Sequence, residues 1–174
     1  DFKGLKFRVP QGMTADLMTK LGASVIILPG GEVYSALERG VVDSTDWGTP
    51  SMNYRLGFHE VTKYFIPKFH SMPDGDFTVN MDEWKKLPDD IKVILEAAVR
   101  EYAWDSVERV ALDDIKAEAE MVKKGITRIV WSDTELLRIR KVASTIWDEW
   151  AAKSPLSKKI IDSQKAWLKD IGQI

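Results

Sequence analysis

The sequence contains no cysteine and only two histidines, His59 and His70, in 174 residues. The missing cysteines exclude disulfide bonds, thiolate nucleophiles and every zinc or iron–sulfur site with cysteine ligands. Two histidines leave few ways to build a histidine-rich metal site or a nucleophile that depends on a histidine base. These absences remove most cysteine-dependent and many metal-dependent activities from consideration.

A large charge of either sign is also absent, because 25 Lys and Arg residues stand against 27 Asp and Glu residues. Without a basic excess to displace counterions from a phosphate backbone, general nucleic-acid binding is not expected. No apolar run approaches the roughly 20 residues that a bilayer span requires, so we predict a soluble globular chain. Its length favours one domain, or one and a fraction.

Common catalytic motifs are missing, among them the glycine-rich nucleotide fingerprints and Gly-x-Ser-x-Gly. The segment that starts at His59 begins like a zinc-protease helix, but Lys63 stands where the second histidine is required. Two pairs of adjacent carboxylates occur, Asp89-Asp90 and Asp113-Asp114. We interpret both pairs as structural, since the first lies at a predicted helix start and the second within a charged helix.

The first third of the chain alternates short apolar runs with helical patterns. Strands are expected over 5–9, 24–28 and 41–45, and helices over 14–21 and 32–39. Three strands joined by helices predict a parallel sheet, whose ligands lie beyond the carboxyl ends of the strands. The segments that follow the three strands are Pro10–Gly12, Pro29–Gly31 and Thr45–Pro50.

The rest of the chain is predicted to be mainly helical. Apolar residues at helical spacing predict a long helix over 88–124, and Ser132 with Glu135 forms a capping-box pattern that opens a helix through Lys153. The remaining expected elements are strands over 60–66, 76–81 and 126–131 and a last helix over 154–171. Six tryptophans on or next to the predicted helices are interpreted as packing residues: Trp84, Trp104, Trp131, Trp147, Trp150 and Trp167.

Several sequence words together resemble one family. They are KGLKFRVP at 3–10, LPGGEVYSALERGVVD at 28–43, Asp46-Trp47, LGF at 56–58 and VNMDEWKKLP at 79–88. This combination is similar to the solute-binding subunit of tripartite ATP-independent periplasmic (TRAP) transporters, and closest to the branch that binds 2-oxo and 2-hydroxy monocarboxylates with a metal ion. Since members of the family are about twice as long, the resemblance implies that this chain corresponds to the C-terminal half.

The resemblance implies a specific ligand site. Arg8 is expected to grip the substrate carboxylate, and a guanidinium fork at the end of a strand fits that task. Asp46 and Trp47 fall where the branch carries an acidic residue and a tryptophan that hold a sodium or calcium ion, and oxygen ligands suit such cations. Trp47 would also line the substrate, and His70 would make a polar contact with it.

The resemblance further implies an α/β fold of the type II periplasmic-binding kind, here a fragment of a two-lobed protein. The expected parts are a second-lobe ligand-binding segment with its crossing over 1–75, a return strand, long helix and short strand over 76–131, and C-terminal helices over 132–174. Such a protein lies in the periplasm, catalyses no reaction and delivers its solute to a membrane permease. A homodimer through the C-terminal helix is also implied.

Two other readings of the same residues stay open at this point. The first is an α/β enzyme that acts on a small carboxylate, with His70 as general base and Asp46 or Asp74 as its partner. The second is a helical scaffold for a protein partner, in which Arg8 is an ordinary surface charge. Turnover of a 2-oxo acid would favour the enzyme, whereas partner binding without any small-molecule ligand would favour the scaffold.

Overall fold

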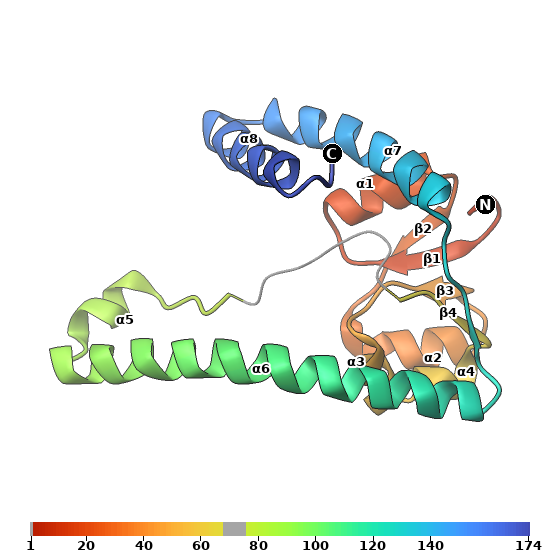
Figure 1. The fold of residues 1–174 in the computed structure, drawn as a ribbon, viewed down its shortest axis with the longest axis horizontal. Helices are drawn as coiled ribbons and strands as arrows, with labels where there is room; N and C mark the ends of the chain where they lie inside the picture. The colour runs from red at the N-terminus through yellow and green to blue at the C-terminus, as the bar shows by residue number, and fades with distance from the viewer. Residues whose placement is uncertain (1, 68–75) are drawn as a thin grey trace.

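The computed structural model describes residues 2–67 and 76–174. At its centre lies a three-stranded parallel sheet of order β2-β1-β3, in which β1 is Lys6–Val9, β2 is Ser24–Ile27 and β3 is Ser44–Thr45 (Figure 1). Phe7 of β1 pairs with Val25 on one side and Ser44 on the other. The predicted β-α-β-α-β order and the parallel pairing are therefore confirmed, with a shorter third strand than expected.

Helices connect and cover these strands. The connections are α1 (Met13–Lys20) and, after the short 3₁₀ turn η1 (Gly30–Glu32), α2 (Val33–Glu38). The chain continues through α3 (Pro50–Arg55), α4 (Phe58–Val61), β4 (Tyr64–Phe65), α5 (Met81–Lys86), α6 (Asp89–Lys123), β5 (Thr127–Arg128), α7 (Asp133–Ala151) and α8 (Pro155–Asp170). Strands β4 and β5 form a separate parallel pair.

Each face of the sheet has its own apolar cluster. Phe7 and Val9 pack on one face with residues of α1 and α7: Leu17, Met18, Ile139 and Ile146. The other face carries Val33, Ala36, Leu37, Val42 and Phe58, with Ile26, Leu28 and Trp47 packed against them. Because alternate residues of a strand point to opposite faces, Arg8 points toward this second cluster.

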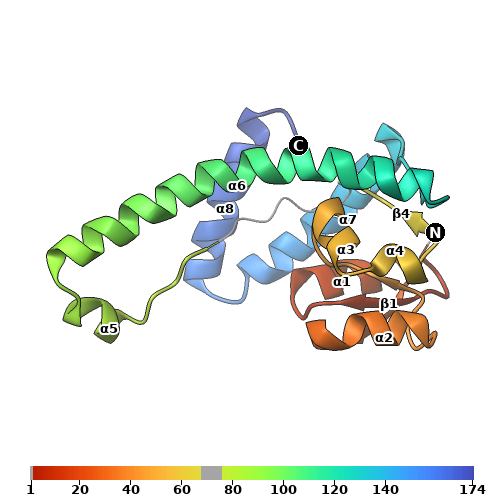
Figure 2. The ribbon, with the colours of Figure 1, turned by 90° about the horizontal axis from the view of Figure 1, so that it is seen from below.

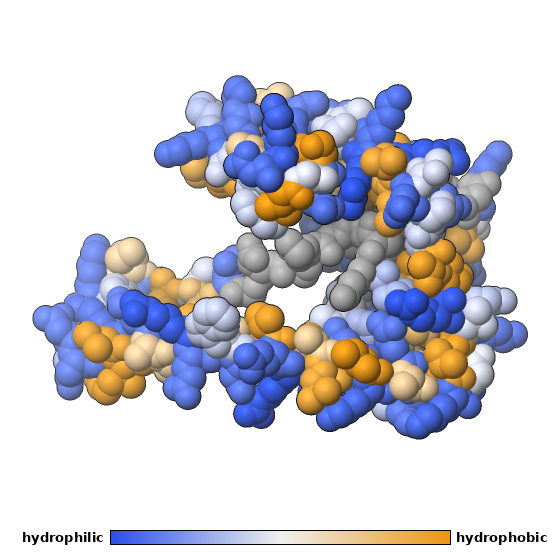
Figure 3. Space-filling view, in the orientation of Figure 1, coloured by the Kyte–Doolittle hydropathy of each residue, from blue (hydrophilic) through white to orange (hydrophobic). Residues whose placement is uncertain are grey.

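Helix α6 begins far from the sheet, and its C-terminal third packs against α3 (Figures 1 and 2). The main-chain N–H of Ser51, in the first turn of α3, donates to the carboxylate of Asp114 at 2.8 Å, and Arg55 forms an ion pair with Asp113. The structural interpretation of this acidic pair is therefore confirmed. Hydrophobic side chains are exposed on the surface along α6 (Figure 3). Large side chains of α6 that stay exposed are Val93, Ile94, Tyr102, Trp104, Val107, Leu112 and Ile115.

Several expected elements differ from the structure. The segment 60–66 is not one strand, since α4 extends to Val61 and only Tyr64–Phe65 is extended in a pair. No strand forms over 76–81, where Asn80 instead caps α5 by accepting from the N–H groups of Asp82 and Glu83. The strand expected over 126–131 is limited to Thr127–Arg128.

The capping box at the start of α7 is present, because Ser132 accepts from the N–H of Glu135 while the Glu135 carboxylate accepts from the N–H of Ser132. Two of the tryptophans interpreted as packing residues do not pack into a core within the described part of the chain, where Trp104 is 75% exposed and Trp167 is 48% exposed. Among the described residues, no helix has the length and apolar character that a membrane span requires.

Candidate functional site

Arg8 lies at the carboxyl end of the central strand, and main-chain carbonyls of the two flanking segments hold its guanidinium. Nε and Nη2 donate to the carbonyl of Leu28 at 3.1 and 2.8 Å, and Nη1 donates to the carbonyl of Asp46 at 2.9 Å. Leu28 directly follows β2 and Asp46 directly follows β3. The ends of three parallel strands thus converge on one cationic side chain, as the parallel sheet predicted.

The environment of Arg8 is dry for a charged group. Only 6% of the residue is exposed, and burial lowers the pKa of its guanidinium, although the negative charge of Asp46 opposes that shift. An arginine keeps its charge under such conditions, because its ordinary pKa is very high. A buried cation whose partners are neutral carbonyls is chemically able to attract an anion.

Donor counting shows what Arg8 can still bind. A guanidinium has five N–H groups, and the described residues accept from one each on Nε, Nη1 and Nη2. One N–H therefore remains on each Nη within the described part of the chain. Two such N–H groups on neighbouring nitrogens match the two oxygens of a carboxylate.

Trp47 forms a wall beside Arg8. The carbon Cζ of Arg8 lies 5.1 Å from the centroid of the Trp47 ring, which is a cation–π distance, and Phe58 meets the same ring edge-on at 5.9 Å. The proximity of Arg8 and Trp47 that the resemblance implied is therefore present in the structure. An aromatic face next to a guanidinium excludes water from it and strengthens its attraction for an anion.

Asp46 contributes both main-chain and side-chain groups to this end of the sheet. Its N–H donates to the carbonyl of Arg8 at 2.9 Å, and its carbonyl accepts from Arg8 and from the hydroxyl of Thr45. Sodium and calcium prefer oxygen donors, so the half-buried carboxylate of Asp46 is chemically suited to contribute one ligand. No group of three potential ligands among His, Asp and Glu occurs within residues 2–67 and 76–174, so such an ion would need further oxygens from ligand, water or elsewhere in the protein.

Of the two histidines, the structure describes only His59. His70, like Asp74, lies outside the described residues. His59 is buried, stacks on Tyr54 with ring centroids 4.2 Å apart, and contacts Nζ of Lys124 through Nε2 at 3.2 Å. Burial, and then the positive charge of Lys124, lowers the pKa of His59. This histidine therefore joins the α3–α4 region to the end of α6, which is a structural role.

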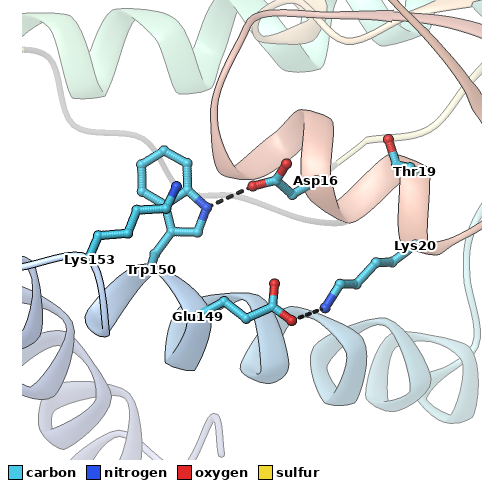
Figure 4. Close-up of a pocket in the computed structure, with 6 residues that line it drawn as sticks. All are labelled: Asp16, Thr19, Lys20, Glu149, Trp150 and Lys153. Carbon is cyan, nitrogen blue, oxygen red and sulfur yellow. Dashed lines mark hydrogen bonds and ion pairs between the residues drawn. The ribbon is translucent and has the colours of Figure 1, made fainter.

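A separate hollow of about 280 Å³ lies between α1 and α7 (Figure 4). Trp150 donates from its indole N–H to Asp16 at 2.7 Å, and Nζ of Lys153 lies 3.2 Å from the centroid of the Trp150 ring. Lys20 and Glu149 pair across the same junction. These contacts hold α7 against α1, and the polar groups of the hollow are partners of each other, so their role is structural.

Sequence reasoning missed the groups that hold Arg8. The carbonyls of Leu28 and Asp46 carry no side-chain signal, and only the rule that parallel strand ends converge could have suggested them. Gly30 was also not assigned to the site, although its main chain lies directly against the ring of Trp47. The contact between Gly30 and Trp47 depends on the tertiary fold, because the two residues are far apart in the sequence.

Comparisons with known proteins place the chain in a family. Residues 1–154 match the family described as bacterial extracellular solute-binding protein, family 7 (DctP). A monocarboxylate 2-oxoacid-binding periplasmic protein of Nostoc sp. is 30% identical over 173 residues, which cover 98% of this chain and 47% of that protein.

Two solved structures of TRAP periplasmic solute-binding proteins are similar to the chain. One, from Colwellia psychrerythraea with bound calcium and pyruvate, is 28% identical with a TM-score of 0.81. The other, from Pseudoalteromonas atlantica with bound sodium and pyruvate, is 27% identical with a TM-score of 0.79. Each match covers 98% of this chain and 53% of the solved chain.

The fold and the site together define an α/β lobe of the periplasmic-binding type, with a buried arginine at the carboxyl edge of its sheet. The chain belongs to the bacterial extracellular solute-binding protein family 7, DctP. It spans about half the length of the relatives that it matches. Because members of this family bind solutes for transport, the family supports the expectation that the chain is not an enzyme.

Proposed function

We propose that this chain carries one wall of the ligand site of a TRAP solute-binding protein. The proposed ligand is a small 2-oxo or 2-hydroxy monocarboxylate such as pyruvate or lactate. The observation that carries this proposal is the buried guanidinium of Arg8, which holds two carbonyls and keeps one N–H on each Nη for a carboxylate. Trp47 would cover the ligand from one side.

The proposal includes a sodium or calcium ion next to the ligand. Asp46 supports this ion, because its carboxylate belongs to the same residue whose main-chain carbonyl accepts from Arg8. A cation there would balance the negative charges of Asp46 and the ligand and would contact a 2-oxo or 2-hydroxy oxygen. Such an oxygen sits next to the carboxylate only in 2-substituted acids, which gives the site its chemical selectivity. His70 is proposed as a further polar contact.

We further propose that the protein acts in the periplasm and delivers its ligand to the membrane permease of a TRAP system. The names of the relatives support this location and this partner. Two lobes that close on the ligand would produce the form that the permease recognises.

A homodimer through α8 is a separate proposal, supported by the exposed apolar side chains of that helix: Leu156, Ile160 and Trp167. Sedimentation equilibrium tests it, and a monomer at micromolar concentration would contradict it.

The test is ligand binding by the full-length natural protein. Its thermal unfolding is followed with pyruvate, lactate, longer 2-oxo acids and C4-dicarboxylates, with sodium, calcium or neither. A ligand that binds only the folded protein raises the midpoint of unfolding. We expect a shift with a 2-oxo or 2-hydroxy monocarboxylate that Arg8→Ala abolishes.

Asp46→Asn separates the ion from the anion clamp. We expect this variant to lose the ion dependence and to retain a weaker response to the acid, because Arg8 keeps its carbonyl partners. Succinate serves as a control for carboxylates in general, since it lacks the 2-oxygen. No shift with any acid would sink the proposal, and an equal shift with Arg8→Ala would remove Arg8 from the site.

A further inference from the structure

The main chain of Gly30 is in close contact with the indole of Trp47. A Cβ atom placed on Gly30 would lie 2.3 Å from Cη2 and 2.8 Å from Cζ3 of that ring. Both distances are far below van der Waals contact, so no side chain fits at position 30 unless Trp47 moves. Phe58 meets the same ring edge-on, so contacts with both residues define the present place of the ring.

The same short segment also holds Arg8. The carbonyl of Leu28 accepts from Nε and Nη2 of Arg8, and Gly30 follows two residues later, at the start of η1. The Leu28–Gly30 segment therefore contacts both groups. The carbonyl of Leu28 holds the guanidinium of Arg8, and the missing side chain of Gly30 lets the indole of Trp47 lie against the main chain. The distance between the cation and the aromatic wall depends on this one loop.

We infer that Gly30 is a positioning residue that sets the size of the ligand accepted beside Arg8. This inference rests on the proposed function and deepens it. By allowing the indole to lie against the main chain, Gly30 keeps Trp47 over the guanidinium and leaves room for an acid with a short side chain. A methyl group at position 30 displaces the ring, which removes the wall from short acids and opens space for longer ones.

The adjacent glycine provides a matched control. Gly31 has no heavy atom within 4 Å of the position that its Cβ would take, and neither glycine adopts the left-handed backbone conformation that disfavours alanine. Gly30→Ala and Gly31→Ala thus make the same chemical change one residue apart, one against Trp47 and one in open space. Trp47→Phe supplies the second arm, because phenylalanine lacks the ring atoms that reach Gly30.

The experiment measures affinities by calorimetry in the full-length protein for pyruvate and for a 2-oxo acid with a branched side chain. We expect Gly30→Ala to weaken pyruvate binding by about tenfold, which corresponds to a modest cost of overpacking, and to raise the relative affinity for the branched acid. Gly31→Ala is expected to leave both affinities unchanged. In the Trp47→Phe background, the effect of Gly30→Ala is expected to disappear.

Equal effects of the two alanine variants, or an undiminished effect of Gly30→Ala beside Phe at position 47, would overturn the inference. So would an equal loss for both acids, because a merely destabilised fold does not change their ratio. If the native protein bound neither acid, the proposed function would fail and the ligand-size assignment with it. The near-ultraviolet circular dichroism of the native protein and its four variants then still reports whether Gly30 positions the Trp47 ring.

Discussion

The guanidinium of Arg8 donates two hydrogen bonds to a single oxygen, the main-chain carbonyl of Leu28, at 3.1 and 2.8 Å. A carbonyl dipole shared in this way partly compensates the burial of a positive charge without neutralising it. The side chain is held rigidly before any ligand arrives. Preorganisation of this kind reduces the entropy that binding would otherwise cost.

Arg8→Lys is expected to lose ligand binding and to destabilise the lobe. A lysine has one nitrogen and cannot donate to both the Leu28 and Asp46 carbonyls while it also forks onto a carboxylate. A Leu28 carbonyl left without its Arg8 donors costs about 1–3 kcal/mol in the free energy of unfolding, which urea titration measures, whereas the Asp46 carbonyl still accepts from the hydroxyl of Thr45. Arg39→Lys, at an exposed position, is the control and is expected to change neither quantity. Retention of ligand binding by Arg8→Lys would mean that charge alone, and not the fork, holds the ligand.

Two adjacent aspartates of α6 should differ in their effects. Asp114→Ala removes the acceptor for the N–H of Ser51 at the start of α3, and losses at such caps are typically about 0.5–2 kcal/mol. Asp113→Ala removes only an ion pair with the well-exposed Arg55, which we expect to change stability by less than about 1 kcal/mol. Denaturant unfolding of the two variants compares them directly, and a larger loss for Asp113→Ala would contradict this assignment.

The stability of the protein should fall in mild acid because of His59. Burial and Lys124 lower its pKa in the folded state, so the folded protein takes up this proton less readily than the unfolded chain. The contribution of neutral His59 is fully present above the unfolded pKa of about 6.5 and is lost as the pH falls through the lower folded pKa.

His59→Gln tests this pH dependence, because an amide oxygen can still accept from Lys124 and does not titrate. Unfolding midpoints of the native protein and of this variant, measured between pH 7.5 and 4.5, should diverge as the pH falls, with the native protein losing more. Parallel curves would show that His59 does not carry the acid sensitivity.

The capping box of α7 gives a prediction for stability alone. Ser132→Ala removes the acceptor for the N–H of Glu135 and is expected to cost about 1 kcal/mol. Ser144→Ala in the same helix is the matched control. Among the described residues its hydroxyl donates to the carbonyl of Lys141 alone, three residues earlier, and alanine favours the helix, so no loss is expected. A similar loss in both variants would show that the helix interior, and not its cap, is sensitive.

The elements that sequence predicted best have strong local signals. Short apolar runs identified β1 and β2, and apolar residues at helical spacing over 88–124 predicted α6 to within a few residues. The errors lie where a turn or a helix cap overrides the alternation of apolar residues. Residues 60–61 belong to α4, which begins after Gly57 in the left-handed conformation, and Asn80 caps a helix where the apolar residues Phe77, Val79 and Met81 alternate like a strand.

The candidate site was predictable only in part. Arg8, Asp46 and Trp47 were found because sequence words resembled a family and because the ends of parallel strands converge. The carbonyl of Leu28 and the missing side chain of Gly30 have no such signal, since their roles depend on atoms brought together from distant segments. A main-chain group becomes part of a site through geometry alone.

Helix α6 has a mechanical consequence. It is a single helix of 35 residues, and its anchor at Asp114 lies near one end. With a rise of 1.5 Å per residue, its first turn lies about 37 Å from that anchor. A rotation of about 5° at the α3 contact would therefore swing the far end by about 3 Å. Helix α6 therefore converts a small change of angle beside the sheet into a larger displacement at α5.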